Sequence, residues 1–104
     1  QVMPRLKADA ICDIKLPESN VVYCVKWLDI RLMIPKLNEP GWNGDLMIPL
    51  ARPLPTNAGD ITHLHMEAKG RYVTVYHLAD HYKTSRYTRK EFIRRLRKAV
   101  EIKK

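Results

Sequence analysis

Apolar and polar side chains alternate in the N-terminal part of the chain, and this pattern predicts strands. Residues 10–16 carry an apolar side chain at every second position, and two of the intervening positions are charged. Residues 17–20 are Pro-Glu-Ser-Asn, which is typical of a turn. The following residues 21–30 are rich in β-branched and aromatic side chains, which favour a second strand. We therefore expect a β-hairpin that joins these two strands across the turn.

The middle of the chain is rich in proline and glycine, and it repeats one short motif. Leu-Met-Ile-Pro occurs at 32–35 and again at 46–49. Because proline lacks a backbone N–H, we expect each copy to be a short strand that ends at its proline or lies at a sheet edge. Turn-forming residues gather near 35–45 and 51–60, so we expect flexible loops there, with an internal boundary of the chain in the second.

Residues 61–78 return to an alternating pattern. A Lys-Gly pair at 69–70 interrupts the pattern and predicts a turn, so this segment is expected to form a second hairpin. A helix through residues 75–82 is the competing prediction, because the apolar residues in that range also have helical spacing.

The last element has the clearest pattern. Thr88 can cap the N-terminus of a helix, and Glu91 three positions later completes a capping box. Beyond this signal, apolar residues recur at helical spacing and predict one buried stripe on a helix over residues 88–102. The stripe consists of Phe92, Ile93, Leu96, Ala99 and Val100. The expected fold is therefore α+β: a small, mostly antiparallel β-sheet with a C-terminal amphipathic helix packed on it.

The length and composition agree with one domain that spans residues 1–104. A chain of 104 residues suits a single core, and the first residue, Gln1, suggests a piece of a longer protein. No apolar run reaches the ~18 residues of a membrane span, and no signal peptide is recognisable, so we expect no membrane partner. Cys12 and Cys24 are too few for a disulfide scaffold, and reduced thiols suggest an intracellular protein.

Positive charge is concentrated in the last third of the chain. Residues 1–68 carry 7 Lys or Arg and 8 Asp or Glu, whereas residues 69–104 carry 12 and 3. On a helical wheel the cations fall opposite the apolar stripe, so they are expected to form a cationic surface that faces solvent. The candidate phosphate-binding residues are Arg86, Arg89, Lys90, Arg94, Arg97 and Lys98, with Lys103 and Lys104 extending the surface.

Cations beside aromatic residues favour nucleic acid as the partner. Lysine and arginine neutralise phosphates, and aromatic rings stack on unpaired bases. Tyr82 and Tyr87 are the candidate stacking residues. An acidic protein surface is the alternative partner, because the same charges would attract it. A helix-turn-helix with helices at 78–82 and 88–102 is a further structural alternative for the tail.

The remaining candidate residues match no catalytic or metal-binding motif. The four histidines and two cysteines lack the close paired spacing that zinc sites usually show. The sequence has neither a nucleophile elbow nor a glycine-rich phosphate loop. We therefore expect a binding module and not an enzyme, with no metal and no cofactor.

One short segment is similar to a known family. Tyr23-Cys24-Val25-Lys26-Trp27 resembles the Tyr-x-Val-Lys-Trp strand of chromo and chromoshadow domains. Those domains are small curved sheets with a C-terminal helix packed across them, and the resemblance implies a nuclear, chromatin-associated module that binds a methylated tail or a partner peptide. Tyr23 and Trp27 would help to form an aromatic cage that attracts a cation. Together with Trp42, they are the candidate residues for this alternative, a protein-interaction function.

Overall fold

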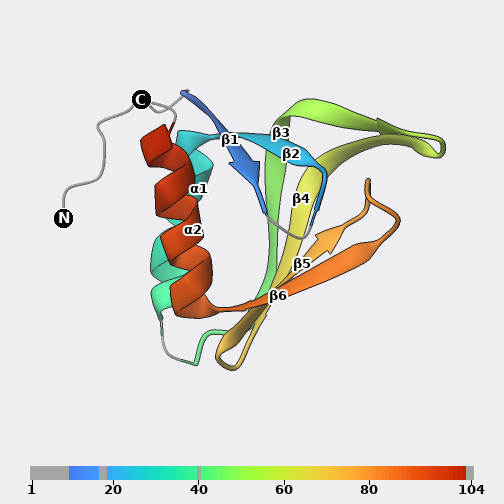
Figure 1. Cartoon of the computed structure of the whole chain (residues 1–104). Helices are drawn as coiled ribbons and strands as arrows, with labels where there is room; N and C mark the ends of the chain where they lie inside the picture. The colour runs from blue at the N-terminus through green and yellow to red at the C-terminus, as the bar shows by residue number, and fades with distance from the viewer. Residues whose placement is uncertain (1–9, 17–18, 40, 103–104) are drawn as a thin grey trace.

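The structure, a computed structural model, describes residues 10–16, 19–39 and 41–102, with side chains up to residue 98. Lys103, Lys104 and part of the predicted turn at 17–20 lie outside these residues, as do the side chains of Ala99 and Val100. The described part contains six strands and two helices (Figure 1). In chain order they are β1 (Ile11–Lys15), β2 (Val22–Lys26), α1 (Trp27–Asn38), β3 (Gly44–Thr56), β4 (Gly59–Lys69), β5 (Tyr72–His77), β6 (Lys83–Thr88) and α2 (Arg89–Ile102).

The six strands form one curled sheet in which each strand pairs with its neighbour in sequence. The strand order is β1-β2-β3-β4-β5-β6, and every pairing is antiparallel. The hairpins predicted within residues 10–30 and 61–78 are present as β1–β2 and β4–β5. The predicted fold class, an α+β fold with the C-terminal helix packed on an antiparallel sheet, is confirmed.

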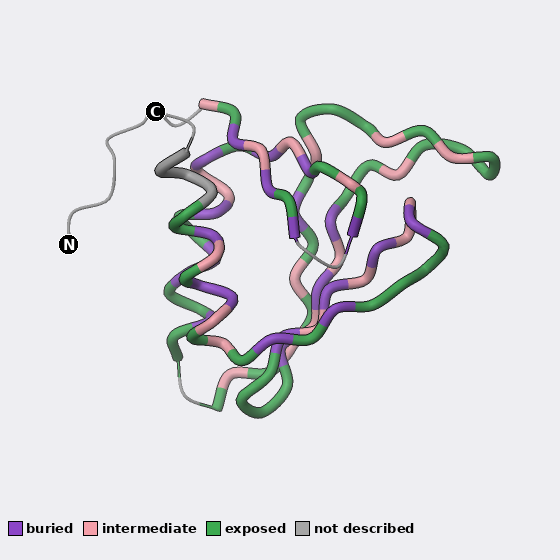
Figure 2. Tube along the Cα trace, in the orientation of Figure 1, coloured by how far each residue is buried: buried purple, intermediate pink, exposed green. Residues whose placement is uncertain are grey.

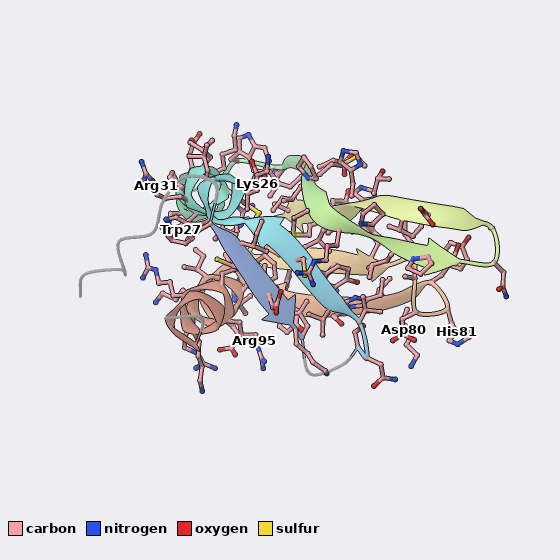
Figure 3. All side chains as sticks on the ribbon, turned by 90° about the horizontal axis from the view of Figure 1, so that it is seen from above. Lys26, Trp27, Arg31, Asp80, His81 and Arg95 are labelled. Carbon is pink, nitrogen blue, oxygen red and sulfur yellow. The ribbon has the colours of Figure 1, made fainter. Side chains whose placement is uncertain are left out.

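Both helices lie side by side on the same side of the sheet (Figures 1 and 3). α1 follows β2 directly, and α2 follows β6 directly. The Arg89 guanidinium donates a hydrogen bond to the Leu37 carbonyl, which shows that the end of α1 lies close to the start of α2. The two helices therefore run antiparallel, and each turns one face to the sheet and another to its neighbour.

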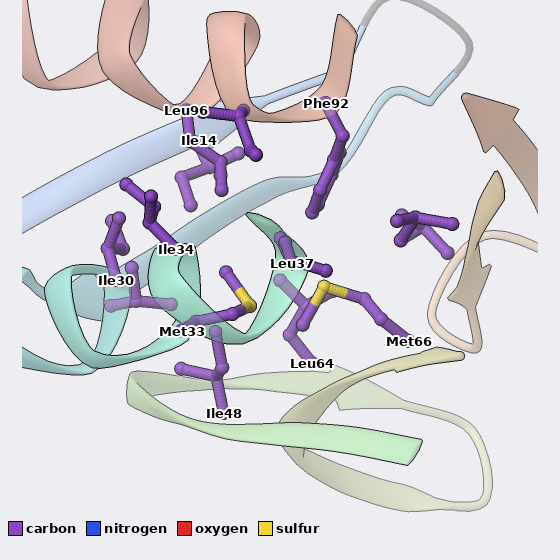
Figure 4. Close-up of a cluster of buried hydrophobic side chains, with 14 of the residues drawn as sticks. Ile14, Ile30, Met33, Ile34, Leu37, Ile48, Leu64, Met66, Phe92 and Leu96 are labelled. Carbon is purple, nitrogen blue, oxygen red and sulfur yellow. The ribbon is translucent and has the colours of Figure 1, made fainter. Parts of the chain in front are cut away.

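The core fills the space between the helices and the sheet (Figure 4). Phe92 and Leu96 from α2 belong to the same hydrophobic cluster as Ile30 and Leu37 from α1, and all four are almost fully buried. Burying one such side chain stabilises a fold by about 1.5–3 kcal/mol, so this apolar stripe holds α2 in place. The outer sides of the helices are exposed, and the turn end of the β3–β4 hairpin, residues 51–63, is exposed or half-buried (Figure 2).

Residues 27–38 form a helix, so the prediction of a strand through residue 30 was wrong. The prediction of a short strand at the first Leu-Met-Ile-Pro motif, residues 32–35, was wrong for the same reason. β2 ends at Lys26, and α1 begins at once. The buried residues of α1 recur three or four positions apart. They are Trp27, Ile30, Met33, Ile34 and Leu37. This spacing buries one helical face against the sheet and outweighs the local strand preference of β-branched residues. Pro35 lies inside the helix, one turn before its end.

The prediction of a loop near residues 51–60 was also wrong, because β3 and β4 form one long hairpin that includes these residues. Only residues 57–58 form the turn between the two strands. The pairing register of the hairpin shifts between Pro49 and Leu54. On its other side β3 pairs with β2 at one position only, so it resembles an edge strand, where proline is tolerated.

Two further predictions are corrected at the ends of elements. The loop expected near 35–45 is shorter, because α1 continues to Asn38 and β3 begins at Gly44. The competing helix over 75–82 is absent, because β5 runs to His77 and a turn follows it. Since the next element is strand β6, the tail does not form a helix-turn-helix.

The turn between β5 and β6 holds two non-glycine residues in the left-handed conformation. His81 and Tyr82 both have a φ of 58°. The Lys83 N–H closes the turn by donating to the Asp80 carbonyl at 3.2 Å. Asn-Gly is the usual choice for two such positions, and a non-glycine residue costs roughly 1–2 kcal/mol at each. The rest of the structure must therefore hold this turn in place.

Candidate nucleic-acid interface

The start of α2 is fixed by its own side chains. Thr88 Oγ1 accepts a hydrogen bond from the Glu91 N–H at 3.2 Å, as the predicted cap requires. The Glu91 carboxylate binds cations of its own helix: Arg94 Nη2 and Arg95 Nε lie 2.7 and 2.9 Å from Oε2. The hydrogen bond from Arg94, followed by the charges of both arginines, holds the pKa of Glu91 below its ordinary value.

The buried stripe of α2 directs the opposite side of the helix towards solvent. Phe92, Ile93 and Leu96 are buried, as predicted. Four cations of the predicted surface are exposed, and they line a groove of about 500 Å³ between α2 and the end of α1. We call this the cationic groove; its lining residues are Asn38, Lys90, Ile93, Arg94, Arg97 and Lys98.

The cations of the groove differ in how far the protein already neutralises them. Arg94 is 61% exposed and pairs with Glu91, three positions away on the same helix. Exposed pairs of this type contribute little to stability, so a phosphate can compete for the guanidinium. Among the side chains that the structure describes, which end at Lys98, no carboxylate lies within ion-pair distance of Arg97 or Lys98. The ion pair with Glu91 is thus the one described ion pair of a groove cation.

Arg89, the residue before the groove residue Lys90, occupies a structural position at the start of α2. Its guanidinium donates to the carbonyl oxygens of Gly70 (2.7 Å), Leu37 (3.4 Å) and Trp42. It also donates to Asn43 Oδ1 at 3.4 Å. Arg89 thus ties the β4–β5 turn and the α1–β3 loop to the first residue of α2. The sequence pattern of cations could not distinguish this role from phosphate binding.

Arg86 lies on the outer face of the sheet and not in the groove. Its guanidinium carbon is 4.7 Å from the centre of the Tyr72 ring, on the neighbouring strand β5. Tyr72 pairs in register with Thr88, the residue just before α2. This exposed arginine therefore lies near the start of α2, on the face of the sheet that points away from the helices.

The two predicted stacking residues lie in different environments. Tyr87 is only 6% exposed and packs in the core, with its ring centre 5.7 Å from that of Phe92. Its position offers no open ring face to a base. Tyr82 is 73% exposed, but it lies at the β5–β6 turn. It lies six positions before Thr88, which is about 20 Å at the usual rise per residue of a strand. Neither tyrosine lies in the cationic groove.

The candidate peptide-binding residues are also separated. Tyr23 and Trp27 are each 2% exposed and belong to the core. Trp42 is half-buried in the α1–β3 loop, and Lys36 Nζ lies 5.3 Å from the centre of its ring. An aromatic cage needs ring faces that a ligand can reach. Among these three residues only Trp42 offers such a face, and the chromo-like resemblance stays a prediction.

A buried polar cluster closes the end of the sheet opposite the helices, and sequence reasoning missed it. Tyr23 Oη lies 2.6 Å from His77 Nδ1, and His77 Nε2 lies 2.7 Å from Ser85 Oγ. These residues come from β2, β5 and β6, which only the curl of the sheet brings together. Burial raises the pKa of Tyr23 to about 12. A serine next to a histidine can act as a nucleophile, but Ser85 and His77 are both buried, so no substrate reaches them in this structure.

Asp80 connects the same end of the molecule to the β1–β2 turn. Its Oδ2 accepts hydrogen bonds from the Asn20 N–H at 3.2 Å and from Ser19 Oγ at 3.3 Å. The backbone hydrogen bond from Asn20 is the main reason that the pKa of Asp80 is lowered. Figure 3 shows Asp80 and His81 far from Arg95 on α2, at the other end of the sheet.

Metal-binding and redox candidates form no centre among the described residues. Cys12 and Cys24 are not joined in a disulfide, as predicted, and Cys24 donates to Asp13 Oδ1 at 2.9 Å. His65 Nε2 lies 3.7 Å from Asp45 Oδ1 on the adjacent strand. Within residues 10–16, 19–39 and 41–102, no three His, Cys, Asp or Glu side chains gather as metal ligands would.

Neither helix in the described ranges is long and apolar enough to cross a membrane. No family model, no curated protein and no solved structure matches the chain.

Proposed function

We propose that the chain is a non-enzymatic nucleic-acid-binding module that holds phosphates in the cationic groove. The observation that carries the proposal is the groove itself, in which four cations converge on a volume of about 500 Å³. Phosphate contacts from lysine and arginine provide most of the affinity in non-specific binding to nucleic acid. The net charge of +8 adds long-range attraction to the same partner.

The spacing of the cations supports a polyanion over a single small anion. Lys90, Arg94 and Arg97 follow one another at four and three positions along α2. Seven residues of helix span about 10 Å, a length over which one nucleic-acid strand carries about three phosphates. On the other helix, Arg31 is exposed and lies seven positions before Asn38, which places it on the same side of α1. Arg31 therefore adds one exposed cation to the side of α1 that carries Asn38.

A salt series tests the proposal. The whole chain is titrated into a generic duplex DNA and a generic RNA at rising salt, and the slope of log affinity against log salt is measured. Replacing Arg94 and Arg97 by alanine should make the slope shallower by about two phosphate contacts, each worth about 0.9 for duplex DNA. Arg52→Ala is the matched control, because Arg52 is exposed on the distant β3–β4 hairpin. Binding that ignores salt, or an unchanged slope in the double variant, contradicts the proposal.

An acidic protein surface is the alternative partner for the same groove. A pull-down from extract, with and without nuclease, separates the two partners. Loss of the captured material after nuclease supports nucleic acid. Recovery of a protein that the Arg94 and Arg97 double variant no longer captures would favour the acidic protein instead.

A further inference from the structure

Tyr72 is an exposed aromatic residue on β5, next to the strand that leads into α2, and it is not one of the two stacking residues predicted from the sequence. Tyr72 is paired in register with Thr88, two positions before the groove residue Lys90. The Arg89 N–H donates to the Arg71 carbonyl at 2.9 Å, so the start of α2 is bonded to the residue just before Tyr72. Strand β6 is the edge of the sheet, and α2 leaves directly from it. Tyr72 therefore lies close to the start of α2, on the outer face of the sheet.

Tyr72 has cations on both sides. On β4 its register partner is Lys69, which is exposed. On β6 the Arg86 guanidinium covers the Tyr72 ring at 4.7 Å. The ring itself is 40% exposed. Both a tyrosine ring and an arginine guanidinium are flat groups on which nucleic-acid bases stack, and their mutual contact holds them in place before a ligand arrives.

The next aromatic residues on this face are less suitable. Tyr76 donates a hydrogen bond to Glu67 at 3.0 Å, and this contact is the main reason that its pKa is raised. Its ring centre lies 4.9 Å from that of His65, which in turn faces Asp45. Two carboxylates therefore lie on that part of the sheet, where they repel phosphates. The cationic surface ends at Tyr72.

We propose that Tyr72 and Arg86 form a stacking platform for one unpaired base, so that the chain prefers single-stranded nucleic acid to duplex. This inference rests on the proposed function, because the phosphates of the same strand would occupy the cationic groove. A duplex keeps its bases paired and stacked, and removing one from the stack costs a few kcal/mol. A single strand offers its bases without that cost.

Binding of the intact chain to a short single-stranded DNA and to the same sequence as a duplex, at one salt concentration, tests the inference. The single strand should bind more tightly. Tyr72→Ala should weaken single-strand binding roughly 5- to 150-fold, the equivalent of about 1–3 kcal/mol for one stacked base, and should leave duplex binding unchanged. Tyr72→Phe should retain the preference, because the ring remains.

Two variants serve as controls. Tyr82→Ala removes a tyrosine that is more exposed but about 20 Å from Thr88, and it should change neither affinity. Tyr72→Leu keeps an apolar side chain without a ring, so it should match Tyr72→Ala in binding even if the alanine variant is unstable. Equal losses on single strand and duplex, or no loss in either Tyr72 variant, would overturn the inference. If the chain binds no nucleic acid at all, the proposed function itself fails, which is a separate outcome.

Discussion

The helix end of the molecule and the end that carries the strand turns both hold clusters of polar side chains, but they differ in how those side chains are bonded. At the turn end, Tyr23, His77 and Ser85 are buried and bonded to one another. At the helix end, Arg97 and Lys98 are exposed beside a groove. The side chains of the first cluster are hydrogen-bonded to one another, whereas Arg97 and Lys98 are exposed and have no ion pair among the described side chains.

Arg89 shows that the difference is set by partners and not by residue type. It belongs to the same helix as Arg97, and both are arginines in a cationic segment. Arg89 is half-buried among backbone carbonyls, and Arg97 is exposed. A charged donor with several internal acceptors stabilises the fold, and one without them is available for binding. We therefore expect different effects from the same substitution at the two positions. Arg89→Ala should destabilise the fold, whereas Arg97→Ala should weaken binding.

The largest effect is expected for Arg89→Ala. Removing the guanidinium leaves the carbonyls of Gly70 and Trp42 without this donor, so the free energy of unfolding should fall by roughly 3 kcal/mol. Denaturant unfolding measures it. Arg97→Ala is the matched control and should change stability by less than about 0.5 kcal/mol while weakening nucleic-acid binding. If both substitutions weaken binding alike and neither destabilises the chain, the structural role assigned to Arg89 is wrong.

The next effect is a loss of stability at alkaline pH. Burial, together with the negative charge of Asp80, raises the pKa of Tyr23 from 10 in the unfolded chain to about 12 in the folded state. Because the folded state binds the Tyr23 proton more tightly than the unfolded chain does, this proton contributes to the free energy of unfolding. The contribution is complete below pH 10 and is lost as the pH rises towards 12. The loss should amount to about 2–3 kcal/mol.

Chemical denaturation between pH 9 and 12 measures this contribution, with Tyr23→Phe as the reference because it removes the titrating group. The wild-type chain should lose more stability over that range than the variant. Equal slopes in the two proteins would show that Tyr23 titrates as an exposed tyrosine does.

The smallest effect concerns the β5–β6 turn. Replacing His81 and Tyr82 by Asn and Gly gives the left-handed positions the residues they favour, and should stabilise the chain by about 1 kcal/mol. Thermal unfolding is the measurement. Because the turn is far from the cationic groove, the affinity for nucleic acid should not change. A loss of affinity would instead assign Tyr82 the stacking role that the sequence predicts for it.

The predictions that succeeded rest on long, regular patterns. The C-terminal helix has a cap at Thr88 and an apolar stripe through Phe92 and Leu96, and both are present. Its cationic side follows from the same periodicity, so most of the groove was predictable. The contribution of Asn38 was not, because it depends on where α1 packs.

The predictions that failed lie where local preference and long-range packing disagree. The valines and prolines of residues 21–60 favour strands and loops. In the structure, however, Trp27–Asn38 is a helix and the segment near residue 55 is a strand. In both segments the secondary structure depends on the part of the protein against which the segment packs. A window of neighbouring residues contains no information on that part of the protein.

The sequence by itself determined the α+β class, the amphipathic C-terminal helix and the location of the charge, because periodicity and composition are properties of the chain. The tertiary structure decided which cations are available, since hydrogen-bond partners such as the Gly70 and Trp42 carbonyls come from distant segments. It also decided the Tyr23–His77 contact, whose two residues are 54 positions apart in sequence. Contacts across such separations form only when the sheet curls, and no local pattern encodes them.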